Sequence, residues 1–215
     1  MTTRGLGALL ALALVGAAGG YVAARLLEPA PATVSVAAPV PASSPSIPVD
    51  PERPYAADID YPPLLPGLGY RRHHLGDSPY EWVYDAPKGW KATQEGLDEV
   101  RWRPAGQPTV GGYSLRTKLI TENKSPADMV AQKLAAMQAG YDDVEVLGQT
   151  DDLLSFSYRD STRDTRRFNT FRWFTIPGES VAKFEMSVVG RDADRAGLAD
   201  LLQRVGAGVT KVQQP

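Results

Sequence analysis

The sequence predicts an α+β fold, an α/β sandwich in which an antiparallel sheet of about six to eight strands is covered by two helices. A single transmembrane helix and a proline-rich stalk are expected to precede it. Three observations carry this prediction. Residues 6–24 contain no charged side chain, residues 28–67 hold eleven of the eighteen prolines, and residues 68–215 alternate apolar and polar side chains over several short stretches. Such alternation is typical of strands with one buried face.

The uncharged stretch at residues 6–24 is long enough to cross a membrane, because a bilayer core takes about 17–25 helical residues. It is also compatible with a cleaved secretory signal peptide, although nineteen residues exceed the usual apolar core of about 7–15. Both alternatives deliver the rest of the chain across the cytoplasmic membrane. We therefore expect residues 1–27 to be a membrane anchor or signal sequence. The domain that follows is extracytoplasmic on either alternative, and it is secreted if the segment is cleaved.

Residues 28–67 are expected to form an extended linker. Prolines alternate there with Ala, Ser and Val, and five acidic residues stand against one arginine, which gives a net charge of −4. A segment of this composition does not bury enough apolar surface to fold. Residues 68–215 carry 20 Lys plus Arg and 20 Asp plus Glu, and are expected to form one globular domain.

Composition excludes several classes of function. The whole chain has a net charge of −2, so it lacks the positive charge by which nucleic-acid-binding proteins hold the phosphate backbone. It contains no cysteine, which excludes disulfides, thiol catalysis and zinc-cysteine clusters. We expect no cofactor and no nucleic-acid partner.

Periodicity and turn chemistry place the elements of residues 68–215 in order. Alternation predicts strands at residues 80–85, 99–103, 113–119, 144–148, 153–159, 166–176 and 180–189.

Two helices interrupt or follow these strands. Ser125, Pro126 and Asp128 predict the start of the first, because a serine side chain accepts the free N–H groups and proline suits the first helical position. Gly140 predicts its end. The second helix, from about Asp192, presents four apolar side chains to the core: Leu198, Leu201, Leu202 and Val205.

Several local patterns together resemble the PsbP-like α/β-sandwich superfamily, over roughly residues 71–209. They are the Pro-Lys-Gly-Trp turn at residues 87–90, the capped helix, Gly-Tyr-Asp-Asp at residues 140–143, the strand that ends in Tyr-Arg at residues 158–159, and the closing helix. That superfamily includes a photosystem subunit, actinobacterial cell-envelope lipoproteins and extracytoplasmic domains of bacterial serine/threonine kinases. The resemblance implies a non-enzymatic binding or assembly domain and assigns no site residues. This chain departs from the lipoproteins in having no cysteine for a lipid anchor.

The sequence contains no recognisable set of catalytic residues. His73 and His74 are the only histidines, and as neighbours on a strand they are expected to point to opposite faces. The acidic pairs at residues 98–99, 142–143 and 151–152 fall where turns or strand starts are expected, and acids there commonly bond the local backbone. We therefore predict no catalytic residue and no metal site.

One basic cluster is a candidate binding site. Arg159, Arg163, Arg166 and Arg167 concentrate near a predicted hairpin tip. Guanidinium groups suit phosphate and carboxylate, so an anionic polymer, an acidic lipid or an envelope protein are the candidate partners. The alternative is a solvated tip in which the arginines pair with Asp160 and Asp164.

Phe171 and Trp173 are a second candidate. They lie on the opposite side of their strand from Phe168 and Phe174, so in a sheet with one core they would form an exposed aromatic anchor. If one helix covers each face of the sheet, they are buried instead.

These observations favour a membrane-tethered, extracytoplasmic interaction or sensor domain without enzymatic activity. Two alternatives stay open: a cell-envelope hydrolase or transferase with an unrecognised active site, and a structural assembly factor.

Overall fold

A computed structural model describes residues 53–212. The predicted membrane segment at residues 1–27 lies outside the described residues, as does most of the predicted linker. Within residues 53–212 there is no helix that is both long and apolar enough to span a membrane. Every element described below belongs to one compact unit, Glu52–Pro215.

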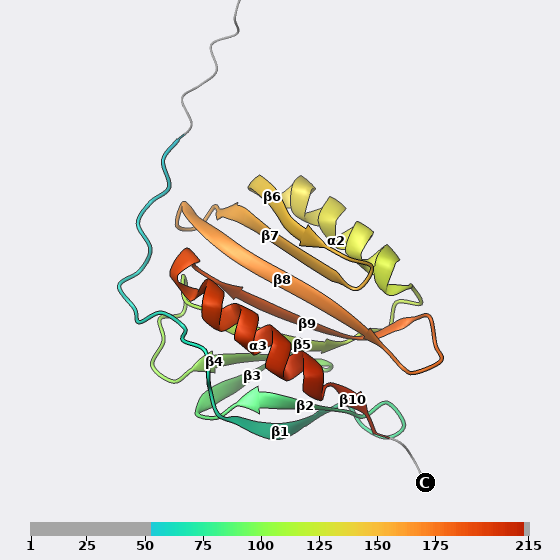
Figure 1. Cartoon of the computed structure of the whole chain (residues 1–215). Helices are drawn as coiled ribbons and strands as arrows, with labels where there is room; N and C mark the ends of the chain where they lie inside the picture. The colour runs from blue at the N-terminus through green and yellow to red at the C-terminus, as the bar shows by residue number, and fades with distance from the viewer. Residues whose placement is uncertain (1–52, 213–215) are drawn as a thin grey trace, which may run out of the picture. The chain divides into compact units, whose positions relative to one another are not determined.

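A seven-stranded sheet forms the centre of the domain, with its strands in the order β3-β4-β5-β9-β8-β7-β6 (Figure 1). All neighbouring strands in it are antiparallel. The bounds are β3 Trp90–Gly96, β4 Glu99–Pro104, β5 Ser114–Leu119, β6 Asp142–Gln149, β7 Leu153–Asp160, β8 Thr165–Thr175 and β9 Ala182–Gly190. The strand count agrees with the prediction for the sheet.

A second, three-stranded sheet corrects the prediction of a single sheet. It consists of β1 Tyr70–Leu75, β2 Trp82–Pro87 and β10 Thr210–Lys211 in the order β1-β2-β10. Trp82 and Tyr84 of β2 pack on Phe184 of β9, with ring centroids 5.4 and 5.8 Å apart, so this small sheet covers a face of the large one. The strand β3 was not predicted, because all its residues after the first are exposed and show no alternation.

The two helices lie on opposite faces of the large sheet (Figure 1). α2, Pro126–Gly140, packs on β6, β7 and β8. Its N-terminus is capped as predicted, since the Ser125 side chain accepts a hydrogen bond from the Asp128 backbone N–H. α3, Arg195–Gly208, follows the single turn η1, Asp192–Asp194, and packs on β9 and on β2 of the small sheet.

Two apolar cores result from this arrangement. The larger core lies between the large sheet, the small sheet and α3, and the smaller one lies between α2 and the strands β7 and β8. Phe171 and Trp173 belong to the smaller core, with only 4% and 1% of their surface exposed. The exposed-anchor alternative for these two residues is therefore wrong, because α2 covers their face of the sheet.

Residues 53–67, here called the N-terminal strap, lie against the domain although the sequence assigned them to the extended linker. They form no helix or strand. Arg191 donates hydrogen bonds to the carbonyl groups of Ile59, Tyr61 and Pro62, and the backbone N–H of Leu64 donates to Asp194. Side chains of the domain therefore satisfy four backbone polar groups of the strap.

The strap passes close to the start of α3 at a glycine. A Cβ atom at Gly197 would lie 2.3 Å from the carbonyl oxygen of Leu64, so any larger residue would displace the strap. Leu64 itself is 3% exposed and belongs to the larger core. The predicted linker thus ends before residue 53, and its remaining residues lie outside the described part of the chain.

Candidate ligand-binding groove

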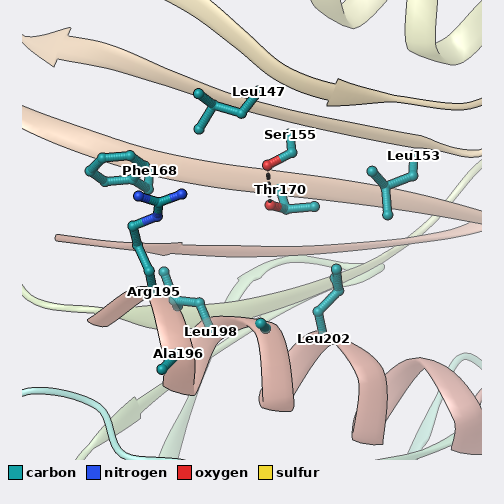
Figure 2. A pocket seen from close by; sticks show the side chains of 10 residues that line it. Leu147, Leu153, Ser155, Phe168, Thr170, Arg195, Ala196, Leu198 and Leu202 are labelled. Carbon is teal, nitrogen blue, oxygen red and sulfur yellow. Dashed lines mark hydrogen bonds between the residues drawn. The ribbon is translucent and has the colours of Figure 1, made fainter. Parts of the chain in front are cut away.

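A groove of about 560 Å³ lies between α3 and the strands β6, β7 and β8 (Figure 2). It exists because α3 covers the middle of its face of the sheet and leaves the outer strands beyond it open. The groove is lined by Leu147, Leu153, Ser155, Phe168, Thr170, Arg195, Ala196, Leu198, Ala199 and Leu202.

Secondary structure explains why these side chains meet. Leu153 and Ser155 on β7 face the groove because the alternate residues, Leu154 and Phe156, are buried under α2. On α3, positions 195, 198, 199 and 202 are spaced by three or four residues and so share one side of the helix. Leu202, which was predicted to be a core residue, is half-buried and forms part of the groove wall.

The floor of the groove is apolar apart from one pair of hydroxyl groups that bond to each other. The side-chain oxygens of Ser155 and Thr170 are 3.0 Å apart and bond to each other (Figure 2). The surrounding leucines are open to solvent to different degrees, and Leu147 on the edge strand is 41% exposed. The Ser155–Thr170 bond uses one of the two hydroxyl hydrogens, so a ligand that enters the floor meets one further hydroxyl donor in an otherwise apolar surface.

Arg195 is the one charged residue among the ten that line the groove. Its guanidinium lies 4.9 Å from the ring centroid of Phe168, at one end of the groove (Figure 2). Its acidic partner is Asp192, at 3.6 Å, and both side chains are more than half exposed. An exposed ion pair of this kind contributes little and leaves the cation free to bind other anions.

More arginines lie beyond the Phe168 end of the groove. Arg166 stacks on the Phe168 ring at 5.6 Å, donates to Ser157 and pairs with Glu145. Arg159 stacks on Tyr55 of the strap at 3.9 Å.

Acidic side chains neutralise Arg159. It donates to Asp143 and Asp164 at 2.7 and 2.8 Å, and these hydrogen bonds lower the pKa of both carboxyl groups. Arg53 of the strap donates to the same Asp164.

The structure does not bring the four predicted arginines into one site. Arg166 and Arg167 are neighbours on β8 and point to opposite faces, as the alternation of a strand requires. Arg167 is 4% exposed and donates to the carbonyl groups of Gly111 and Gly112. Arg163 is exposed at the β7–β8 tip, and Arg159 has the internal carboxylate pairing of the solvated-tip alternative.

The histidines and paired acids stay apart. His73 packs edge-on against Trp102 with ring centroids 4.3 Å apart, and burial lowers its pKa. His74 faces the other way and bonds Glu81 at 2.6 Å, as the strand alternation predicted. Asp142 and Asp143 begin β6, and the pair at residues 151–152 forms the β6–β7 turn. Asp98 lies in the β3–β4 turn, and Glu99 begins β4. In residues 53–212, no three His, Asp or Glu side chains are grouped so as to hold a metal ion.

The groove itself was not predicted as a site. Its residues were assigned to strands and to the closing helix, where apolar side chains indicate a core. One signal was present in the sequence: small residues, Ala196 and Ala199, occupy the same side of the helix as Leu202, where a fully packed helix would carry larger side chains.

Comparisons with known proteins add little to this geometry. No protein-family model matches the chain, and no curated protein matches it. Among solved structures, the crystal structure of LpqN, described as involved in cell envelope biogenesis of Mycobacterium tuberculosis, is similar with a TM-score of 0.41 and 13% sequence identity. The match covers 66% of this chain and 90% of LpqN. Likeness at this level does not establish a family, so the PsbP-like resemblance stays a prediction.

Proposed function

We propose that this protein is a membrane-tethered, extracytoplasmic binding domain without enzymatic activity, and that it binds a single-chain amphiphile in the groove between α3 and β6–β8. The apolar chain lies along the leucines, and the anionic group lies at Arg195. The observation that carries this proposal is the composition of the groove, which is apolar except for one hydroxyl pair and one guanidinium at its end.

The size and chemistry of the groove support such a ligand. Small-molecule sites typically measure about 300–1,000 Å³, and this groove falls within that range. Each methylene of a chain that leaves water contributes roughly 0.8 kcal/mol, so Leu147, Leu153 and Leu202 favour an extended apolar chain. The Ser155–Thr170 pair interrupts the apolar floor at one place only.

The polar groups near the groove support binding rather than catalysis. Ser155 has no histidine beside it, because both histidines lie on β1 of the small sheet. Acid–base or nucleophilic chemistry needs a base within hydrogen-bond reach of the reacting group. The arginines beyond Phe168 are already paired with Glu145, Asp143 and Asp164, so Arg195 is the cation in the groove lining that the ligand's anionic group meets.

The location outside the cytoplasm rests on the sequence. The uncharged residues 6–24 and the proline-rich residues that follow them are the features of an anchor and a stalk. This proposal is compatible with both a sensor and an assembly factor, because each would first bind the ligand in the groove. The two functions differ in the event that follows binding.

Photolabelling of the full chain tests the groove. The probe is a medium-chain fatty acid with a diazirine at the end of its chain, and mass spectrometry identifies the labelled peptides. We expect label on the peptides that contain Leu147, Leu153 and Leu202. Arg195→Gln should reduce that label roughly two- to fivefold, the worth of one exposed charge pair, and Leu202→Glu should abolish it.

Arg204→Gln is the matched control, since it makes the same change on the same helix at a side chain that is 70% exposed and does not line the groove. It should leave the labelling unchanged. Label that is insensitive to both groove substitutions, or that concentrates on peptides outside the groove, would contradict the proposed function.

A further inference from the structure

A second cleft lies on the other face of the large sheet, next to α2. It consists of two adjoining cavities of about 230 and 310 Å³ that share Arg101, Ser114, Tyr158 and Val189. The side chains that line it come from β4, β5, β7, β8 and β9, from α2 and the residue after it, and from the loop between β4 and β5. It shares no lining residue with the groove described above.

The cleft is rich in cations. Five basic side chains line it, and Asp160 is the only acid that does. The basic residues are Arg101, Arg103, Arg116, Lys133 and Arg167. Three of them have carboxylate partners outside the lining: Arg101 pairs with Glu95, and both Arg116 and Lys133 pair with the buried Glu185.

Arg103 and Arg167 have no carboxylate within salt-bridge distance among residues 53–212. Arg103 donates to the carbonyl group of Thr109 at 3.0 Å, and Arg167 donates to those of Gly111 and Gly112. Carbonyl groups accept hydrogen bonds from some of the N–H groups of a guanidinium, but they do not neutralise its charge. Asp160 lines the same cavity and acts on Arg167 from beyond salt-bridge distance. Two half-buried or buried positive charges in one small cavity are therefore left without an anion in direct contact.

The same cavities hold buried polar atoms that lack a partner. The donors Nε of Arg101 and Nε2 of Gln107 are enclosed and make no hydrogen bond, and an oxyanion would accept from both. The Oδ1 of Asn169, also without a partner, is an acceptor and would need a hydroxyl donor of the ligand instead. Such atoms cost free energy unless a ligand or water satisfies them. Burial also lowers the pKa of Arg103, of Lys133 and of Arg167, and a bound anion would offset the desolvation of these charged groups.

Tyrosines form the wall of the larger cavity. The rings of Tyr141 and Tyr158 are 4.4 Å apart, and Tyr141 is 40% exposed. Burial raises the pKa of Tyr158 to about 12, so its hydroxyl stays protonated and remains a donor at neutral pH. An aromatic wall beside a cationic pocket suits an oxyanion carried on a larger organic framework, with an apolar part against the rings.

We infer that this cleft is a binding site for an oxyanion, phosphate or carboxylate, which Arg103, Arg167 and the Nε–H of Arg101 coordinate. The site is independent of the groove and of the amphiphile proposed for it. The oxyanion is either a free ion or a substituent of a sugar or similar ring that extends toward Tyr141.

Calorimetric titration of the full chain in detergent distinguishes a free oxyanion from an oxyanion carried on a sugar. The probes are inorganic phosphate, glucose 6-phosphate, glucuronate and neutral glucose. We expect the anions to bind and glucose not to bind, with affinities that fall as salt is raised. Tighter binding of glucose 6-phosphate than of inorganic phosphate assigns the site to a sugar-borne anion, and equal binding assigns it to the free ion. Arg103→Gln should weaken binding about tenfold, the equivalent of one charged hydrogen bond.

Arg72→Gln is the control, because it removes an equivalent charge on the small sheet from a side chain that is 71% exposed. It should leave the affinity unchanged. A second measurement needs no variant: glucose 6-phosphate should protect Arg103 of the wild-type chain from modification by phenylglyoxal. Binding of glucose equal to that of the anions, or unprotected Arg103 at saturating anion, would overturn the inference.

Discussion

Arg191 and Asp194 form the ion pair that holds the N-terminal strap on the domain. Both side chains are buried, with 2% and 0% of their surface exposed, and two hydrogen bonds of 2.8 Å join them. Burial by itself raises the pKa of Asp194, but the bonds from Arg191 and from the backbone N–H of Leu64 lower it overall. The contribution of this carboxylate to stability is therefore present above the ordinary Asp pKa of about 3.9 and is lost as the pH falls below it.

Removal of Arg191 should be costly, because it leaves a buried carboxylate without its cation and three strap carbonyl groups without a donor. We predict that Arg191→Met lowers the free energy of unfolding by about 3–5 kcal/mol, measured from denaturant midpoints. The double variant Arg191→Met with Asp194→Leu should recover part of this loss, since no lone charge stays buried. Arg204→Met, at an exposed arginine, should change stability by less than about 0.5 kcal/mol. A negligible effect of Arg191→Met would mean that the strap is not bound this way.

At the scale of elements, α2 explains why β8 is apolar on both faces. Phe168 and Phe174 face α3 and the groove, while Phe171 and Trp173 lie under α2. The Nε1–H of Trp173 donates to the buried Glu185, which also binds Arg116. β8 therefore contributes side chains to both cores. Through Glu185, its Trp173 is also linked to Arg116 of the charged cleft.

Trp173→Ala should destabilise the domain by about 3–5 kcal/mol, because it opens a cavity under α2 and leaves Glu185 without one of its donors. Chemical denaturation followed by circular dichroism measures this loss. Trp173→Phe, which keeps most of the ring, should cost less. Tyr80→Ala is a control at an aromatic residue that is 71% exposed. Full stability of Trp173→Ala would mean that α2 does not pack on this face.

Local signals in the sequence predicted most elements of the fold, and long-range packing accounts for what they missed. The Ser125 cap and the alternation in β7, β8 and β9 depend on neighbouring residues, so they can be read from the chain. β3 could not be predicted in this way, because an exposed edge strand carries no alternation. The strap could not be predicted either, since Arg191 and Asp194 bind it from more than 120 residues away along the chain. The groove and the cleft lie where a helix does not cover the strands beside it. Which strands stay uncovered depends on the order of the strands in the sheet, and the sequence does not show that order.

At the scale of the whole domain, the width of the sheet creates both candidate sites. Seven strands at about 4.8 Å spacing span roughly 29 Å, whereas one helix is only about 10 Å wide. α2 covers the β6–β8 end of one face, and the small sheet with α3 covers the β3–β9 part of the other. The offset leaves the apolar groove beside α3 and the cationic cleft beside α2. Two separate ligands of different chemistry are therefore compatible with one fold.

The central claim is that this two-sided domain binds its ligands outside the cytoplasm while the N-terminal segment holds it at the membrane. Protease treatment of intact cells that express the full chain tests it most directly, with an antibody against the domain as the readout. The account predicts that the chain fractionates with the membrane, and that external protease removes residues 68–215 while a cytoplasmic marker stays intact. Recovery of the domain in the cytosol, resistant to protease until the cells are lysed, would contradict the account.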